Sequence, residues 1–153
     1  MRYTKLLLVL LGFAATLSAA DLFVGTWKMN PAKAKYSVGK APKEQTITIT
    51  ETGSDLEVKI EGIAADGSKI SFGYTIPAAG GNGKVVAASP YYDSVSGKRV
   101  RPNERIVSYI KGGKSVYTAR SRVSADGSTL SVSSKGLSAS GQTVDANVVY
   151  DRQ

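Results

Sequence analysis

The chain has 153 residues, of which 42% are hydrophobic and 21% are charged, and its formal net charge is +8. It contains no Cys and no His, so it has no disulfide and lacks both the commonest general base and the commonest zinc ligand. These absences argue against a metalloenzyme or a His-based hydrolase. We therefore expect a protein that is not an enzyme and that holds no metal and no cofactor.

Residues 1–20 have the three parts of a secretory signal peptide. Two basic residues precede an apolar run over 6–15, and three small residues at 18–20 match the pattern that signal peptidases recognise. The apolar run is shorter than the roughly 20 residues that a transmembrane helix needs. We expect cleavage after Ala20, leaving 21–153 as a single secreted or periplasmic domain without a transmembrane segment.

The first predicted strand covers 23–30 and holds the only Trp of the chain. Gly25, Trp27 and Met29 share one face, because side chains along a strand alternate between the two faces. The large indole is thus flanked by a residue without a side chain and by a flexible one. This arrangement is typical of a strand whose Trp fills the end of a barrel.

The connection over 30–43 contains two prolines and predicts at most one helical turn. From Glu44 onward, short runs of β-branched residues alternate with turn residues, which is typical of an antiparallel meander. The further strands are predicted at 45–51, 56–61, 69–76, 84–89, 94–100, 105–111, 114–124, 129–137 and 142–152. A Gly-rich loop is expected at 77–83.

These elements predict an all-β fold, an antiparallel up-and-down β-barrel of about 8–10 strands. We favour a barrel over a sandwich because a meander with matched first and last strands can close, which removes exposed sheet edges.

The Gly25-Thr26-Trp27 run resembles the Gly-x-Trp signature of the calycin superfamily, which contains lipocalins, intracellular fatty-acid-binding proteins and avidins. The segment from Phe23 to Lys28 that contains this run is most similar to the start of the fatty-acid-binding proteins. The resemblance implies a barrel in which a basic residue on the last strand, here Arg152, lies across the Trp and closes the barrel.

Two segments depart from the fatty-acid-binding pattern. The connection over 30–43 is shorter than the helical lid of that family. The Arg-x-Tyr that holds a ligand carboxylate in the family reads Val148-Val149-Tyr150 here, so only the Tyr is present. The chain also resembles small exported bacterial proteins described only as lipocalin-like, and this resemblance implies compartment and fold but no activity.

Our leading hypothesis is an interior that binds a small hydrophobic or amphipathic molecule. The interior candidates are Phe72, Tyr74, Arg99, Tyr117 and Tyr150. Arg99 shares a face with other inward residues, and a cation inside a barrel needs a partner such as a ligand carboxylate. Small inward residues, such as Ala119 and Ser134, either leave room for a ligand or fit the taper of a filled core.

The alternative is an interaction module with a basic outer flank. Between Lys98 and Arg122 lie eight basic residues and one acidic residue. If Ile106 and Ile110 face inward, Arg105 and Tyr109 face outward. The predicted flank consists of Arg105, Lys111, Lys114, Arg120 and Arg122.

Such a flank would bind an acidic polysaccharide, an anionic surface or a protein partner, or it is simply a solvated face. We expect no nucleic acid as a partner, because the chain has no aromatic stacking motif.

Overall fold

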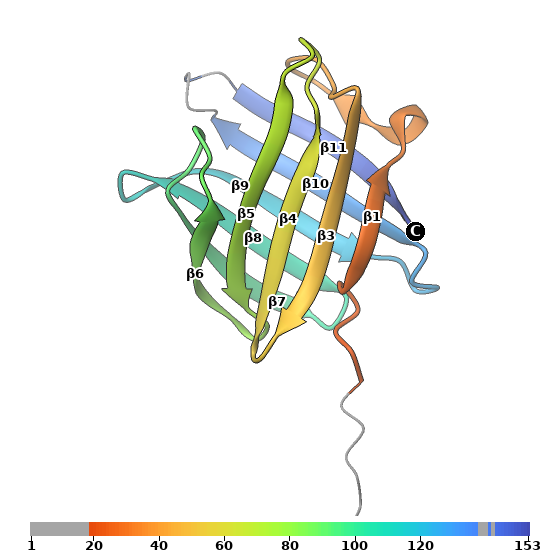
Figure 1. Cartoon of the computed structure of the whole chain (residues 1–153), viewed down its shortest axis with the longest axis vertical. Coiled ribbons are helices and arrows are strands. Elements are labelled where there is room, and N and C mark those ends of the chain that lie inside the picture. Colours follow the sequence, from red (N-terminus) through yellow and green to blue (C-terminus); the bar gives the residue numbers. More distant parts are fainter. Residues whose placement is uncertain (1–18, 138–140, 142) are drawn as a thin grey trace, which may run out of the picture.

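The structure is a computed structural model that describes residues 19–137, 141 and 143–153 (Figure 1). In this part of the chain, 11 strands form one sheet, and no α-helix is present. The strands are β1 (Gly25–Met29), β2 (Lys35–Tyr36), β3 (Glu44–Thr52), β4 (Asp55–Ile63), β5 (Lys69–Pro77), β6 (Gly80–Ala87), β7 (Ser94–Arg101), β8 (Glu104–Lys111), β9 (Lys114–Val123), β10 (Thr129–Leu137) and β11 (Thr143–Arg152).

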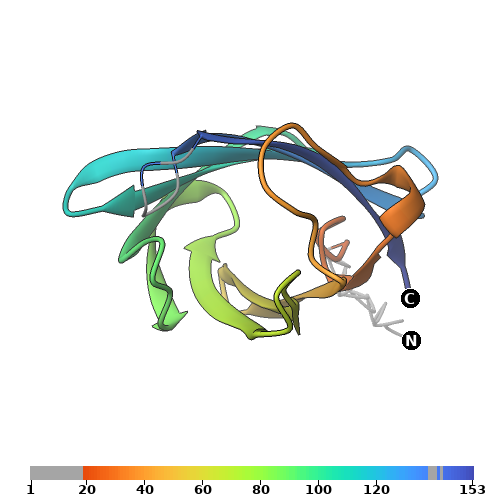
Figure 2. The same ribbon diagram turned by 90° about the horizontal axis from the view of Figure 1, so that it is seen from above.

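Each strand from β3 to β11 pairs antiparallel with the next, and β1 pairs with both β3 and β11. The register that closes the barrel sets Trp27 opposite Arg152. β2 is a two-residue addition to the free edge of β11, beside Ala146 and Asn147. The predicted antiparallel up-and-down barrel is confirmed, and Figure 2 shows the strands encircling the interior.

The connection between β1 and β3 contains a single 3-10 turn, Pro31–Lys33, followed by β2. Pro31 stands at the first position of the turn, where its missing N–H is not needed. Asn30 caps the turn by accepting a hydrogen bond from the N–H of Ala32. This segment lies at the upper rim of the barrel (Figure 1).

The prediction of a loop over 77–83 is wrong in its second half, because β6 already begins at Gly80. Gly80 and Gly81 have φ values of +101° and +133°, which side chains rarely adopt. At Gly83 an added Cβ would lie 2.2 Å from the carbonyl oxygen of Thr75 on β5. At Gly80 and Gly83, the neighbouring strands therefore lie too close to β6 for a side chain.

The inward face of β8 is the opposite of the predicted one. Val107 and Tyr109 are buried in the core, whereas Ile106 and Ile110 are only partly buried. Arg105 shares the inward face and is buried, so its predicted place on the outer flank is wrong. This face can point inward because its two polar groups have partners inside the barrel. The Arg105 guanidinium pairs with Asp21, and the Tyr109 hydroxyl pairs with that of Tyr74.

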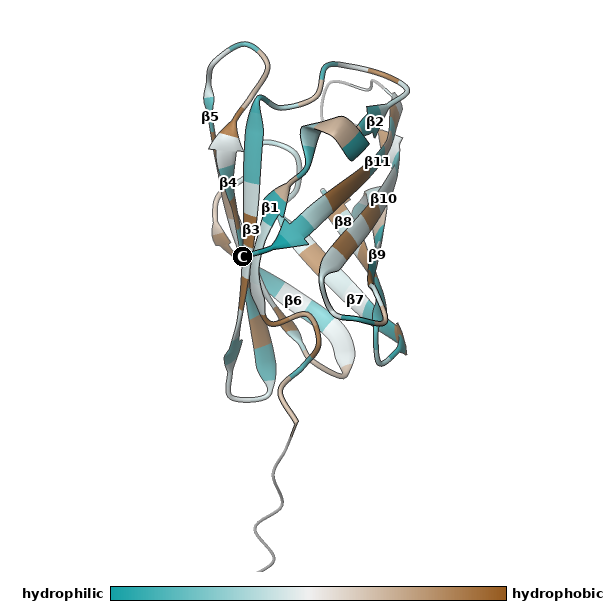
Figure 3. Cartoon of the chain, turned by 90° about the vertical axis from the view of Figure 1, so that its right-hand side faces the viewer, coloured by the Kyte–Doolittle hydropathy of each residue, from teal (hydrophilic) through white to brown (hydrophobic). Residues whose placement is uncertain are grey.

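Hydrophobic and hydrophilic residues alternate along the strands (Figure 3), as expected for a sheet with one buried and one solvated face. The described residues include no helix with the length and hydropathy needed to cross a membrane. The predicted signal peptide falls almost wholly on residues 1–18, which lie outside the described part of the chain.

Candidate functional site

One end of the barrel, where β1 begins and β11 ends, is closed by Trp27 and Arg152. Trp27 is fully buried, and its indole N–H donates a hydrogen bond of 2.9 Å to the carbonyl oxygen of Phe23. The guanidinium carbon of Arg152 lies 4.0 Å from the centre of the indole ring, a cation–π contact. Arg152 also donates to the carbonyl oxygens of Leu22, Val24 and Gly127. The last strand therefore holds the segment before β1 across the barrel end.

Gly25 is required by this closure. Its φ of +144° is a conformation that favours glycine, and an added Cβ would lie 2.5 Å from Nη1 of Arg152. The Gly-x-Trp spacing thus gives room for the guanidinium directly beside the ring that it covers.

An ion cluster lies at the same end, with the side chains of Asp21 and Arg105 buried and that of Arg99 partly exposed. Oδ2 of Asp21 is 2.6 Å from Nη1 of Arg99 and 2.6 Å from Nη2 of Arg105. The guanidinium of Arg105 also lies 5.1 Å from the centre of the Phe23 ring. Arg99 was expected to meet a ligand carboxylate, but the carboxylate at this position belongs to the chain itself.

The protonation state of Asp21 follows from its surroundings. Burial of the carboxyl would raise its pKa, but the Phe23 N–H and the Arg99 and Arg105 guanidiniums outweigh burial and hold the pKa below its usual value. The carboxylate is therefore charged and neutralises a cation that is buried among apolar groups.

The opposite end of the barrel, where β5 and β9 begin, has a half-buried apolar lining. Its side chains pack against the core but are incompletely covered, and we call them the mouth: Tyr36, Ile60, Phe72 and Tyr117. This contrasts with the closed end, where Phe23 and Trp27 are at most 1% exposed. A half-buried apolar lining of this kind can be covered by the apolar part of a ligand.

Tyr117 of the mouth also belongs to a group of four side chains, with Tyr74, Tyr92 and Tyr109, which we call the tyrosine cluster. The rings of Tyr109 and Tyr117 stack with centroids 4.2 Å apart, and those of Tyr92 and Tyr109 are 4.9 Å apart. The hydroxyls of Tyr74 and Tyr109 are 3.2 Å apart and share a hydrogen bond. The cluster combines apolar faces with polar groups.

Tyr92 is the member of the tyrosine cluster whose polar group has no partner. It comes from the loop between β6 and β7, is 2% exposed, and its hydroxyl has no hydrogen-bond partner in the described chain. A buried hydroxyl without a partner costs about 1–3 kcal/mol. Burial raises the pKa of Tyr92, as it does for the other three members, so all four hydroxyls stay protonated and can donate.

The interior candidates are divided between the two ends. Phe72, Tyr74 and Tyr117 lie at the mouth or in the tyrosine cluster, whereas Arg99 lies in the ion cluster at the closed end. The hydroxyl of Tyr150 is 2.5 Å from Oε1 of Gln45 and already donates to it. Burial raises the pKa of Tyr150 as well.

The predicted basic flank is not one surface. Arg105 is inside the barrel, and Lys111 and Lys114 face each other at the hairpin between β8 and β9. Arg120 and Arg122, at the other end of β9, both bind the carboxylate of Glu104, which they largely cover. This pairing neutralises part of their charge.

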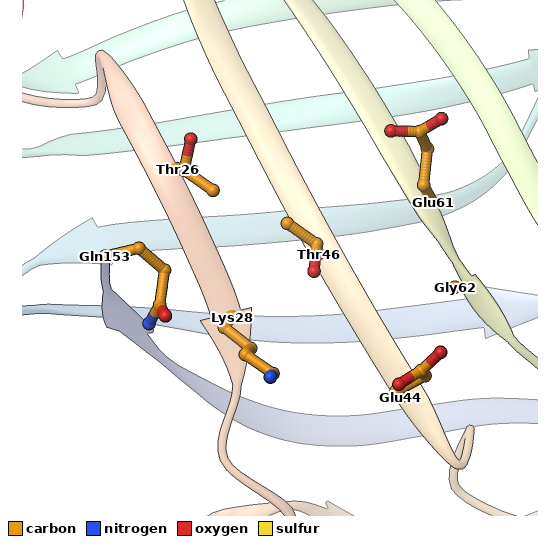
Figure 4. Close-up of a pocket in the computed structure, with 7 residues that line it drawn as sticks. All are labelled: Thr26, Lys28, Glu44, Thr46, Glu61, Gly62 and Gln153. Atoms are coloured by element: carbon orange, nitrogen blue, oxygen red, sulfur yellow. The ribbon is translucent and has the colours of Figure 1, made fainter.

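A polar hollow of about 430 Å³ lies on the outer face of the sheet (Figure 4). Its lining comes from β1, β3, β4 and the last residue: Thr26, Lys28, Glu44, Thr46, Glu61, Gly62 and Gln153. It contains no buried polar group aimed at a ligand. Among the described residues, no three Asp or Glu side chains gather into a potential metal site.

Four interior residues were not predicted from the sequence: Asp21, Phe23, Tyr92 and Tyr109. Strand periodicity does not apply to three of them, because Asp21 and Phe23 precede β1 and Tyr92 lies in a loop. For Asp21, a charge signal existed, because the inward cation expected at Arg99 needed an anion.

No family model matches the chain, and no curated protein matches it. Among solved structures, it is similar to zebrafish ileal bile acid-binding protein complexed with cholic acid, at 11% identity and a TM-score of 0.49, over 86% of this chain and 99% of that one. It is also similar to a redesigned β-barrel, mFAP1, bound to DFHBI, at 14% identity and a TM-score of 0.41, over 86% and 95%.

A third similar structure is the siderocalin Ex-FABP, at 13% identity and a TM-score of 0.38, over 86% of this chain and 71% of that one. The protein class defined by the strand register is a closed antiparallel β-barrel of up-and-down topology. At TM-scores below 0.5, the similar structures carry no argument about what this barrel binds.

Proposed function

We propose that this protein is an exported binding barrel, without catalysis, whose mouth takes up a small amphipathic molecule. The apolar part of the molecule packs between Phe72 and Tyr117, and a polar acceptor on it receives a hydrogen bond from Tyr92. The observation that carries the proposal is the buried Tyr92 hydroxyl without a partner, set beside the half-buried apolar mouth.

The chemistry of the tyrosine cluster supports a neutral or weakly polar acceptor as the ligand's polar group. Hydroxyl donors recognise carbonyl, hydroxyl or ether oxygens, and no Lys or Arg belongs to the mouth or the cluster. The arginines that face inward are already paired with Asp21 at the closed end. A ligand held mainly by apolar contact binds with little dependence on salt.

Titration with Nile red, an uncharged apolar fluorescent dye, tests the proposal. We expect saturable binding at one site, with an affinity that changes little between low and high salt. Phe72→Ala should weaken binding about tenfold, since losing buried apolar contact of about 1.4 kcal/mol corresponds to that factor. Val86→Ala is the matched control, because Val86 is 55% exposed on the strand that follows β5.

The proposal fails if the probe does not saturate, or if Phe72→Ala and Val86→Ala have the same effect. Steep weakening by salt would instead indicate binding to outer basic residues. The positions of Arg105, Arg120 and Arg122 give no support to a continuous basic surface, so we advance no second function.

A further inference from the structure

Asp21 is bound at every polar group that it has. Its carboxylate accepts from Arg99, Arg105 and the Phe23 N–H, and its carbonyl oxygen accepts from the N–H of Val24. Its own backbone nitrogen lies 2.8 Å from Oε1 of Glu51 on β3. The two residues before it, Ala19 and Ala20, are exposed. In the described part of the chain, Asp21 is thus the first residue that is not exposed.

We propose that Asp21 is the amino-terminal residue of the working protein, and that its new ammonium group forms an ion pair with Glu51. Hydrolysis of the Ala20–Asp21 peptide bond by a signal peptidase adds one water: Ala20 keeps a carboxylate, and Asp21 gains an amine that is protonated at neutral pH. The inference rests on the proposed export but not on the proposed ligand.

The position of the cut is limited on one side by the ion cluster. Removing Asp21 as well would leave Arg105, whose side chain is 7% exposed, without its anion. An unpaired buried charge is strongly destabilising. Processing must therefore end before Asp21.

A cut before Ala20 would leave a longer amino terminus, and the protein would then lack the new ion pair. If Ala20 remains attached, the nitrogen of Asp21 is a neutral amide that makes only an ordinary hydrogen bond to Glu51. With the cut after Ala20, the same nitrogen carries a full positive charge at the same place. A charge-assisted hydrogen bond is stronger than a neutral one.

The charges that face this amine come from three strands and from its own residue. Glu51 on β3 and the Asp21 carboxylate favour the ammonium form, whereas Arg99 on β7 and Arg105 on β8 oppose it, though their charge is largely offset by the same carboxylate. The folded state thus raises the pKa of the amine. The added stability is complete below the unfolded value, about 7.7–8.0, and is lost as the pH rises through the folded value.

Two measurements test the inference. The first is the intact mass and amino-terminal sequence of the exported protein, made from the full chain in a secreting host. We expect the protein to begin at Asp21. A retained leader, or a start at any other residue, would overturn the inference, whatever the outcome of the probe titration.

The second compares two proteins released from a fusion partner by a protease, one beginning at Asp21 and one with a single Gly before it. At about pH 6.5 the first should melt about 1–3 °C higher, and at about pH 9.5 the difference should vanish. Glu51→Gln, at an exposed position, should abolish the difference at about pH 6.5. Equal melting at both pH values in the unsubstituted pair would refute the ion pair even if the cut is found after Ala20.

Discussion

The guanidinium of Arg152 covers the indole of Trp27, with its central carbon 4.0 Å from the ring centre. These residues stand opposite each other in the register that joins the last strand to the first. The contact thus lies at the seam where the barrel closes. Because Arg152 also holds the segment before β1 by its carbonyl oxygens, one side chain secures both the seam and the closed end.

Replacing Trp27 tests how much the closed end contributes to stability. Trp27→Ala should lower the free energy of unfolding by about 3–5 kcal/mol, the range for losing a large buried aromatic side chain. Urea unfolding followed by circular dichroism measures it, since the only Trp is lost as a fluorescent probe. An unchanged unfolding midpoint would contradict the buried position of Trp27.

Gly25 should tolerate alanine poorly. Gly25→Ala places a side chain at a φ of +144° and moves Nη1 of Arg152, so we expect a loss of about 2–4 kcal/mol, made up of backbone strain and a weakened closure. Gly53→Ala is the control, because Gly53 also has a positive φ but has no atom within 4 Å of an added Cβ. It should cost about 1–2 kcal/mol. Equal losses in urea unfolding would mean that Arg152 is not close to Gly25.

The ion cluster makes stability depend on pH. The folded state lowers the pKa of Asp21, so its contribution is present above the unfolded value of about 3.9 and is lost as the pH falls through the folded value. Asp21→Asn should therefore cost about 3 kcal/mol at pH 7 and much less at about pH 2.

Asp55→Asn serves as the control, because Asp55 takes part in no ion pair among the described residues. Unfolding in urea at the two pH values measures both variants. A cost for Asp21→Asn that does not change with pH would show that the carboxylate does not supply the charge for Arg99 and Arg105.

Two hydroxyl deletions in the tyrosine cluster should have opposite effects on the ligand-free protein. Tyr74→Phe removes the hydrogen bond to Tyr109 and should lower stability by about 1 kcal/mol. Tyr92→Phe removes a buried hydroxyl without a partner and should raise stability by about 1 kcal/mol. Thermal unfolding after removal of any bound small molecule measures both. A loss in Tyr92→Phe equal to that in Tyr74→Phe would show that the Tyr92 hydroxyl already has a partner.

The strand pattern and the fold could be predicted from the sequence because alternation and turn residues are local signals. The inward face of β8 could not, because Glu104–Lys111 has apolar residues on both faces. The observed face is stabilised by the pairing of Arg105 with Asp21, 84 residues away in the chain. No local pattern contains that contact.

The candidate site was only partly predictable for a related reason. Phe72, Tyr74 and Tyr117 lie on strands, so their inward faces follow from periodicity. Tyr92 lies in a loop, and its burial depends on the space left between β5 and β8 after the barrel closes. Its unpartnered hydroxyl is a property of the packed interior alone.

Native mass spectrometry of the protein purified from its own exported fraction is the most direct test of the binding barrel. We predict a second species, heavier than the bare chain by the mass of one small amphipathic molecule, whose share falls when Tyr92 is replaced by Phe. A bare mass, in protein that also fails to take up the apolar probe, would contradict the proposal and indicate that the interior is a filled core.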